Sequence, residues 1–221
     1  MYLFLRLERQ LFRGSPLETS LRERKIKLVE EAVEYLQQGE LIVYPTDTLY
    51  ALGADVFNEE AVRRIYEVKR RPMSQPLPVA VSNIKEISRV AEVTEEAMRL
   101  AEKFLPGPLT LVLPRKHVVP SIVTGGGETI AVRVPNNLFA LTLLSRYGPL
   151  TATSANIHGT KPLSIIKDIK IQLRDNVKLY IEEGELKGLP STMVDLTTTP
   201  PKVIREGVIP KKQVLSVIED E

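Results

Sequence analysis

Two cations lie close together near the end of an expected helix, and they are the first residues in this chain that could do chemistry. Lys69 and Arg71 flank one residue and stand just before Pro72. Like charges this close repel each other unless an anion or carboxylates lie nearby. The pair could clamp a phosphate or a nucleotide, because Arg supplies a planar fork and Lys a point charge. Alternatively, they are ordinary cations at a helix C-terminus, worth a few tenths to about 1 kcal/mol.

A polar loop follows the apolar segment Leu41–Tyr44, which is rich in β-branched and aromatic residues and predicts a buried strand. After Pro45 come Thr46, Asp47 and Thr48. Three oxygen-bearing side chains in a row at a strand end could bind a polar ligand. An ordinary turn explains the same residues, because Thr and Asp are frequent in turns.

Two further segments combine an expected strand with polar side chains. Ser154 and Asn156 follow the β-branched segment Leu150–Thr153, just as the polar residues Thr46 to Thr48 follow the strand segment before them. Arg133 lies inside the strand pattern of Thr129–Val134. An arginine in a strand can pair with a buried carboxylate, or it can face a cleft and bind the carboxylate of a ligand. The sequence leaves both possibilities open.

Alternating helices and strands must position these side chains. Ser20 with Glu23 is a capping box, Asn58 is an N-cap, and tight Pro and Gly turns separate the elements. The pattern favours one domain around one mixed sheet over 20–221, after a basic lead-in over 1–19. The expected helices cover 20–36, 58–71, 84–90, 94–104, 136–147, 165–173 and 211–218, and the expected strands cover 41–44, 76–81, 109–113, 129–134, 150–153, 177–181, 192–196 and 203–204.

Composition excludes several classes of protein and site. The chain has 221 residues, 43% of them hydrophobic, and a net charge of +2, which does not indicate a nucleic-acid binder. It has no cysteine and only two histidines, which excludes disulfides, thiolate nucleophiles and histidine-rich metal sites. No apolar run is long enough for a membrane span or a secretory signal, so we expect a cytoplasmic protein without a membrane partner.

The motifs of this chain resemble, in order and separation, those of one enzyme family. Lys-x-Arg and Ser-x-Asn are each common, but their combination at this separation is specific. With their flanking segments they resemble the YrdC-like family of threonylcarbamoyl-AMP synthases, the enzymes that begin threonylcarbamoyl modification of tRNA position 37. The resemblance covers about residues 20 to 210 and rests on Pro45–Thr48 with Tyr50 and Gly53, Lys69-x-Arg71-Pro72, Pro76-Leu77, Pro106–Thr110, Arg133–Pro135, Thr153–Asn156, Ser191-Thr192 with Asp195, and Arg205 followed by Gly207.

The resemblance implies a fold and a reaction. The fold would be α+β with three layers, a twisted mixed parallel and antiparallel sheet flanked by helices, and a concave basic cavity. The reaction would convert L-threonine, bicarbonate (or carbon dioxide) and ATP into threonylcarbamoyl-adenylate and pyrophosphate. It needs no protein nucleophile, and catalysis would come from positioning and charge neutralisation. We expect Mg²⁺ on the ATP phosphates and no metal site made of protein ligands.

The resemblance also implies roles for particular residues. Lys69 and Arg71 would be catalytic. The positions expected to hold L-threonine are Thr48, Arg133, Ala152 and Ser191. The positions expected around the nucleotide and its phosphates are Lys69, Arg71, Gln75, Thr129, Ser154, Asn156, Ser164 and Arg205, with looser spacing before Ser164.

Three positions depart from the family pattern. Ala80 stands where many members carry a histidine beside threonine, Gln75 replaces the more usual Asn or Lys, and Ala51 replaces a common Gly. Because the chain ends soon after Arg205, we expect a single-domain member without the extra C-terminal domain of longer relatives. A separate complex would take the adenylate. The alternatives are a double-stranded RNA or tRNA-binding module, and a nucleotide-binding paralogue with altered activity.

Overall fold

Helices flank two sheets in the computed structural model, which describes residues 16–186 and 188–219. The α+β class and the mixed sheets expected from the family resemblance are confirmed. The α-helices are α2 (Pro16–Gln37), α3 (Glu59–Lys69), α4 (Glu95–Phe104), α5 (Leu138–Tyr147), α6 (Ile166–Leu173) and α7 (Lys211–Glu219), with 3-10 turns η1 (Ile84–Arg89), η2 (Ser121–Thr124) and η3 (Arg174–Asn176).

Each sheet contains both parallel and antiparallel pairs. The strands are β1 (Ile42–Tyr44), β2 (Ala51–Gly53), β3 (Val79–Ala80), β4 (Leu109–Pro114), β5 (Thr129–Arg133), β6 (Leu150–Thr151), β7 (Thr153–Ser154), β8 (Leu179–Tyr180), β9 (Thr192–Asp195) and β10 (Lys202–Arg205). One sheet has the order β7-β2-β1-β8, and the other has the order β10-β9-β4-β5-β3-β6. Parallel pairs are β1 with β8, β3 with β5, and β4 with β9.

The expectation of one sheet was wrong, because the strands form two separate sheets. The segment predicted as a single strand over 150–153 is divided between them. Its first part, β6, pairs with β3, and its second part, β7, pairs with β2. Between them, the backbone N–H of Ala152 donates to the carbonyl of Pro78 at 2.7 Å. The buried hydroxyl of Thr151 donates to the carbonyl of Leu52 at 3.0 Å and accepts from the N–H of Ala54 at 2.9 Å. One short segment therefore joins the two sheets.

The predicted N-cap Asn58 is confirmed, whereas the capping box predicted at Ser20 does not begin a helix. The side chains of Asn58, Thr94 and Asn137 each accept a backbone N–H at the start of α3, α4 and α5. Helix α2 begins at Pro16 instead of Ser20, so residues 16–19 of the expected lead-in are helical. Proline suits a first helical turn, where its missing N–H costs nothing. The rest of the lead-in lies outside the described residues.

Two predicted elements are shorter or tighter than expected. The predicted strand over 76–81 pairs only at Val79–Ala80, because Pro76 and Pro78 have no N–H to donate to a ladder. The predicted helix over 84–90 is the 3-10 turn Ile84–Arg89. Its last bond, from the N–H of Val90 to the carbonyl of Ile87, closes three residues back instead of four.

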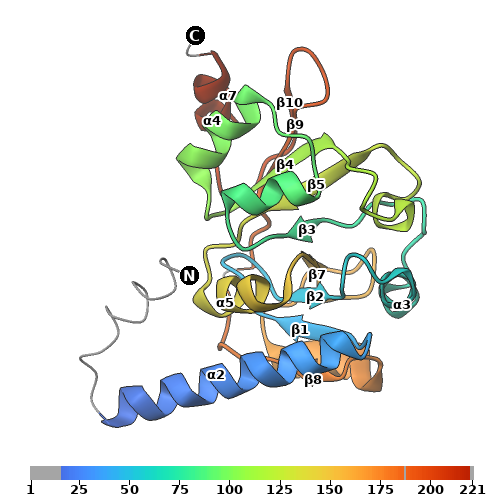
Figure 1. The fold of residues 1–221 in the computed structure, drawn as a ribbon, viewed down its shortest axis with the longest axis vertical. Helices are drawn as coiled ribbons and strands as arrows, with labels where there is room; N and C mark the ends of the chain where they lie inside the picture. The colour runs from blue at the N-terminus through green and yellow to red at the C-terminus, as the bar shows by residue number, and fades with distance from the viewer. Residues whose placement is uncertain (1–15, 187, 220–221) are drawn as a thin grey trace.

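The helices cover different ends of the molecule (Figure 1). Helices α4 and α7 lie side by side at the end formed by the six-stranded sheet, while α2 runs along the opposite end next to β1 and β8. Helix α2 packs on α5 through a buried cluster that includes Val29, Leu36, Phe139 and Leu143. Within the described residues, no helix is both long and apolar enough to cross a membrane.

Candidate functional site

Arg133, at the end of β5, is the centre of a first cluster of polar side chains. It is only 5% exposed. Its Nη1 donates to the hydroxyl of Thr48 at 2.8 Å, and its Nη2 donates to Oδ1 of Asp47 at 2.5 Å and to the carbonyl of Gly107 at 3.3 Å. Burial lowers the pKa of Arg133, while Asp47 acts in the opposite direction. Of the two possibilities that the sequence leaves open, the structure contains the pairing with a carboxylate.

Thr46 shapes the loop that presents these two partners. Its hydroxyl accepts the backbone N–H groups of Thr48 and Leu49, both at 3.2 Å, and donates to the carbonyl of Leu49 at 2.6 Å. These bonds close a tight turn on a buried side chain. The family motif contains Thr46, but sequence reasoning gave it no role. Its role is to fix the direction of Thr48 and Asp47.

Ser191 and Arg205 extend the first cluster from the neighbouring strands. The hydroxyls of Ser191 and Thr110 lie 2.7 Å apart, and Arg205 donates to the carbonyl and the hydroxyl of Ser191 at 3.0 and 3.1 Å. Burial, and then the charge of Arg133, lower the pKa of Arg205, so the two guanidinium groups influence each other. Gly207 permits this close packing, because a Cβ there would lie 2.2 Å from a backbone carbonyl oxygen.

Lys69, the last residue of α3, is the centre of a second cluster. It is 1% exposed. Its ammonium group donates to the backbone carbonyls of Ser154 and Asn156, the latter at 2.6 Å. Burial, and then the nearby charge of Arg71, lower the pKa of Lys69 to about 7. The structure thus brings together the Lys-x-Arg and Ser-x-Asn motifs, as the sequence predicts.

Arg71 and Asn156 complete the second cluster. Arg71 donates through Nε to the carbonyl of Gln75 at 3.2 Å and through Nη2 to that of Pro76 at 3.0 Å, while its Nη1 lies 3.3 Å from Nδ1 of His158. Asn156 donates through Nδ2 to backbone carbonyls of its own loop, and its buried Oδ1 has no hydrogen-bond partner among the described residues. Sequence reasoning missed His158, although it lies only two residues beyond Asn156.

Of the remaining predicted residues, some lie beside these clusters and others lie away from them. Ala152 is in the segment that joins the two sheets, and Ala80 is the strand neighbour of Arg133. Thr129 is exposed at the other end of β5 from Arg133. Ser164 lies beyond the second cluster, where its hydroxyl donates to Glu185 at 3.3 Å.

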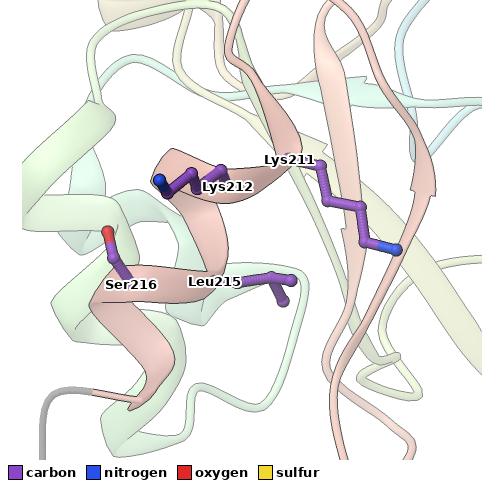
Figure 2. A pocket seen from close by; sticks show the side chains of 4 residues that line it. All are labelled: Lys211, Lys212, Leu215 and Ser216. Carbon is purple, nitrogen blue, oxygen red and sulfur yellow. The ribbon is translucent and has the colours of Figure 1, made fainter.

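The two clusters lie in adjacent parts of the backbone, because Ala51 pairs with Ser154 and the N–H of Ala155 donates to the carbonyl of Tyr50 at 2.8 Å. The concave basic cavity implied by the family resemblance stays a prediction, and the side chains of Lys69 and Arg133 are themselves buried against protein oxygens. A shallow depression lies elsewhere, along α7 (Figure 2). It is lined by Lys211, Lys212, Leu215 and Ser216, and by none of the motif residues.

Solved structures with the same architecture define the class of protein. The structure of Pyrococcus abyssi Sua5 complexed with L-threonine matches with a TM-score of 0.83 and 39% identity, over 86% of this chain and 57% of that one. The crystal structure of Escherichia coli YciO matches with a TM-score of 0.79 and 35% identity, over 84% of this chain and 92% of that one. The fold is therefore that of a YrdC-like domain.

Sequence comparison then places the chain in a family. The model of the Sua5, YciO and YrdC proteins, described as "Telomere recombination", matches residues 34–207, and the chain belongs to this family. The threonylcarbamoyl-AMP synthase of Pyrococcus abyssi is 39% identical over 201 residues, which are 90% of this chain and 58% of that protein. A putative threonylcarbamoyl-AMP synthase of Methanocaldococcus jannaschii is 37% identical over 194 residues, 87% of this chain and 91% of that protein. The chain thus spans little more than half of the Pyrococcus protein.

Proposed function

We propose that this chain is a threonylcarbamoyl-AMP synthase, which makes threonylcarbamoyl-adenylate and pyrophosphate from L-threonine, bicarbonate and ATP. The observation that carries the proposal is the pair of adjacent clusters. One holds a guanidinium and hydroxyls suited to an amino acid, and the other holds two cations suited to phosphates. The relatives named threonylcarbamoyl-AMP synthase support it through their identity with this chain.

The reaction balances without a protein nucleophile. The threonine amine adds to carbon dioxide and releases a proton to give a carbamate, or it condenses with bicarbonate and releases water. A carbamate oxygen then attacks the α-phosphorus of ATP. The bond from that phosphorus to the β-phosphate oxygen breaks, and pyrophosphate leaves. The protein then has to align the carbamate with the phosphorus and offset negative charge on the phosphates, as in other phosphoryl transfers.

The first cluster would bind L-threonine. Arg133 would hold the carboxylate, with the hydroxyls of Thr48 and Ser191 beside it, and Ala152 would line the site. Asp47 already occupies Nη2 of Arg133, so Asp47 and the substrate carboxylate would share this guanidinium. The structure of the Pyrococcus relative with L-threonine supports an amino-acid site in this fold.

The second cluster would bind the triphosphate. Among the described residues, no carboxylate lies within 4.0 Å of the Lys69 or Arg71 nitrogens, so their charge is not neutralised by the protein. We expect Gln75, Thr129, Ser154, Asn156, Ser164 and Arg205 to contribute around the nucleotide. The described residues contain no group of three or more carboxylates or histidines suited to a metal ion. We expect Mg²⁺ to arrive on ATP, keep several waters and neutralise phosphate charge.

Further partners are proposed on the resemblance alone. The adenylate would pass to a separate threonylcarbamoyl-transfer complex, and the reaction would take place in the cytoplasm. Contact with tRNA or double-stranded RNA is the alternative role for the basic residues. A paralogue with another amino-acid preference is the third possibility, since Ala80 removes a polar group beside Arg133.

Pyrophosphate release tests the proposal. With MgATP, release should require both L-threonine and bicarbonate, and the product should carry threonine, one carboxyl carbon and AMP by mass spectrometry. L-serine and L-valine in place of L-threonine measure how selective the Ala80 site is. Release that ignores L-threonine and bicarbonate would contradict the proposal. Salt-dependent RNA binding without such release would favour the RNA-binding alternative.

A further inference from the structure

We propose that His158 is a positioning residue for Arg71. A neutral imidazole at this place accepts a hydrogen bond from the guanidinium through Nδ1 and holds that cation at the phosphate end of the site. The inference rests on the proposed function in one respect, that Arg71 contacts the phosphates. The contact between His158 and Arg71 is observed in the structure and does not depend on that function.

The donor in this contact can be identified from chemistry. Nη1 of Arg71 and Nδ1 of His158 lie 3.3 Å apart. A guanidinium has only donors and stays protonated, so Nδ1 must be the acceptor and carry no proton. In a neutral imidazole the proton is then on Nε2. The contact therefore specifies one tautomer.

His158 is the link between Arg71 and the loop after β7. Through Nε and Nη2 the guanidinium binds the carbonyls of Gln75 and Pro76, which are four and five residues after Arg71 in the chain. The backbone of His158 is fixed in turn, because its N–H donates to the carbonyl of Lys69 at 2.7 Å. Side chain and backbone of His158 thus bind the two members of the Lys-x-Arg motif.

A neutral acceptor suits this place for an electrostatic reason. Arg71 and Lys69 are close enough for the charge of Arg71 to lower the pKa of Lys69. A carboxylate beside Arg71 would hold it firmly but would cancel charge that a phosphate needs. A neutral imidazole nitrogen fixes the direction of the guanidinium and leaves its charge available.

Nuclear magnetic resonance tests the tautomer without any assay of activity. The full chain labelled with ¹⁵N-histidine has only two imidazoles, and His117→Gln assigns them. At pH 8.5 we expect His158 to show a bare Nδ1 and a protonated Nε2, and Arg71→Ala to shift it toward a mixture. A protonated Nδ1 in the unmodified protein would overturn the proposal.

Two conservative variants test the consequence. The amide oxygen of Asn can replace Nδ1, whereas Gln places its amide near the position of Nε2. We expect His158→Ala and His158→Gln to weaken MgATP binding about tenfold, the loss of about one hydrogen bond to a charged group, and His158→Asn to restore most of it. KM for ATP should rise while KM for L-threonine stays constant. The exposed His117, changed to Ala, is the matched control.

The outcomes separate this inference from the proposed function. Rescue by Gln instead of Asn would show that Nε2 is the important atom and would overturn the proposal, as would normal MgATP binding by His158→Ala. If the unmodified protein releases no pyrophosphate with L-threonine and bicarbonate, the proposed function fails. MgATP affinity and the tautomer then still decide whether His158 positions Arg71.

Discussion

Arg133 and Lys69 are both buried cations, but their partners differ in charge. Arg133 is bound by a carboxylate, a hydroxyl and a carbonyl, so its charge is balanced inside the protein. Lys69 is bound by two backbone carbonyls, which are dipoles without net charge. The first cluster, which we propose as the amino-acid cluster, therefore contains a counter-charge for Arg133, although Oδ2 of Asp47 and Nε of Arg133 have no hydrogen-bond partner among the described residues. The second cluster, which we propose as the phosphate cluster, has no carboxylate beside Lys69 among the described residues and keeps an uncompensated positive charge.

This difference indicates what each cluster contributes. A buried ion pair that loses one partner leaves an unpaired charge, which costs about 3 to 5 kcal/mol. A buried cation held only by dipoles destabilises the folded state when charged, and an arriving anion relieves that cost. We expect substitutions in the amino-acid cluster to affect folding strongly. Substitutions in the phosphate cluster should affect ATP and leave the fold intact.

The largest expected effect is on turnover. Lys69→Met keeps the length of the side chain and removes its charge. It should lower kcat by about 10² to 10³, the usual cost of losing one donor to a charged transition state. Circular dichroism and L-threonine binding should stay unchanged. Lys85→Met, at an exposed lysine, is the control. Unfolding of Lys69→Met would contradict the comparison.

The next largest effect is on stability. Asp47→Asn should lower the free energy of unfolding in urea by about 3 kcal/mol, because it leaves Arg133 buried without a counter-charge. Arg71→Gln, in the other cluster, should lower it by less than about 1 kcal/mol, because Arg71 has no carboxylate partner among the described residues.

A double variant sharpens this prediction. Asp47→Asn together with Arg133→Met should be more stable than the sum of the two single losses implies, because no unpaired charge remains. Equal losses for Asp47→Asn and Arg71→Gln would show that the carboxylate does not distinguish the two clusters.

The pH dependence of nucleotide binding should reveal the uncompensated charge. With a pKa of about 7, Lys69 loses its proton as the pH rises from 7 to 9. MgATP affinity should then fall by up to about tenfold per pH unit, because phosphates need the ammonium form. Calorimetry at several pH values measures this affinity, and the MgATP affinity of Lys69→Met should not change over the same pH range. An equal slope in the variant would contradict the assignment.

The lowered pKa of Lys69 also predicts that stability rises with pH, whereas MgATP affinity falls with pH. Its folded-state pKa of about 7 lies below the ordinary 10.5, so the unfolded chain binds more protons between these values. The free energy of unfolding of the unmodified protein, relative to Lys69→Met, should therefore rise with pH across this window. A relative stability that falls with pH would mean that the pKa of Lys69 is raised.

The smallest effect tests whether the amino-acid cluster acts on L-threonine alone. Thr110→Val removes the hydroxyl 2.7 Å from that of Ser191. The loss of one neutral hydrogen bond, about 1 kcal/mol, should raise KM for L-threonine about fivefold. MgATP affinity should not change. A parallel loss of ATP affinity would mean that the two clusters are not independent.

Sequence reasoning worked best where a single residue decides local structure. Asn58, the predicted N-cap, accepts a nearby N–H group with its side chain, an interaction that needs no tertiary information. The expected helices over 94–104 and 136–147 also begin beside capping side chains, those of Thr94 and Asn137. Sequence reasoning failed where strand pairing decides the structure. The two-residue strands β6 and β7 depend on partners far along the chain, so the division into two sheets could not be read from the segment itself.

The site shows the same division between local and distant information. The sequence predicts that Lys69 and Arg71 lie near Ser154 and Asn156, because the family resemblance joins these motifs. It leaves the partner of Arg133 open, since Asp47 lies 86 residues away in the chain. Such partners depend on burial and tertiary geometry, which local patterns do not contain.

The segment from Leu150 to Ser154 has a consequence for how the two substrates would meet. Leu150 pairs with Ala80, the strand neighbour of Arg133, while the carbonyl of Ser154 binds the ammonium group of Lys69. One covalent run therefore connects the amino-acid end of the site to the phosphate end. Bonded distances along a backbone hardly vary. In the proposed reaction, the number of residues between these two anchors would therefore limit how far apart the carbamate and the phosphorus can lie, and an inserted or deleted residue would change that limit.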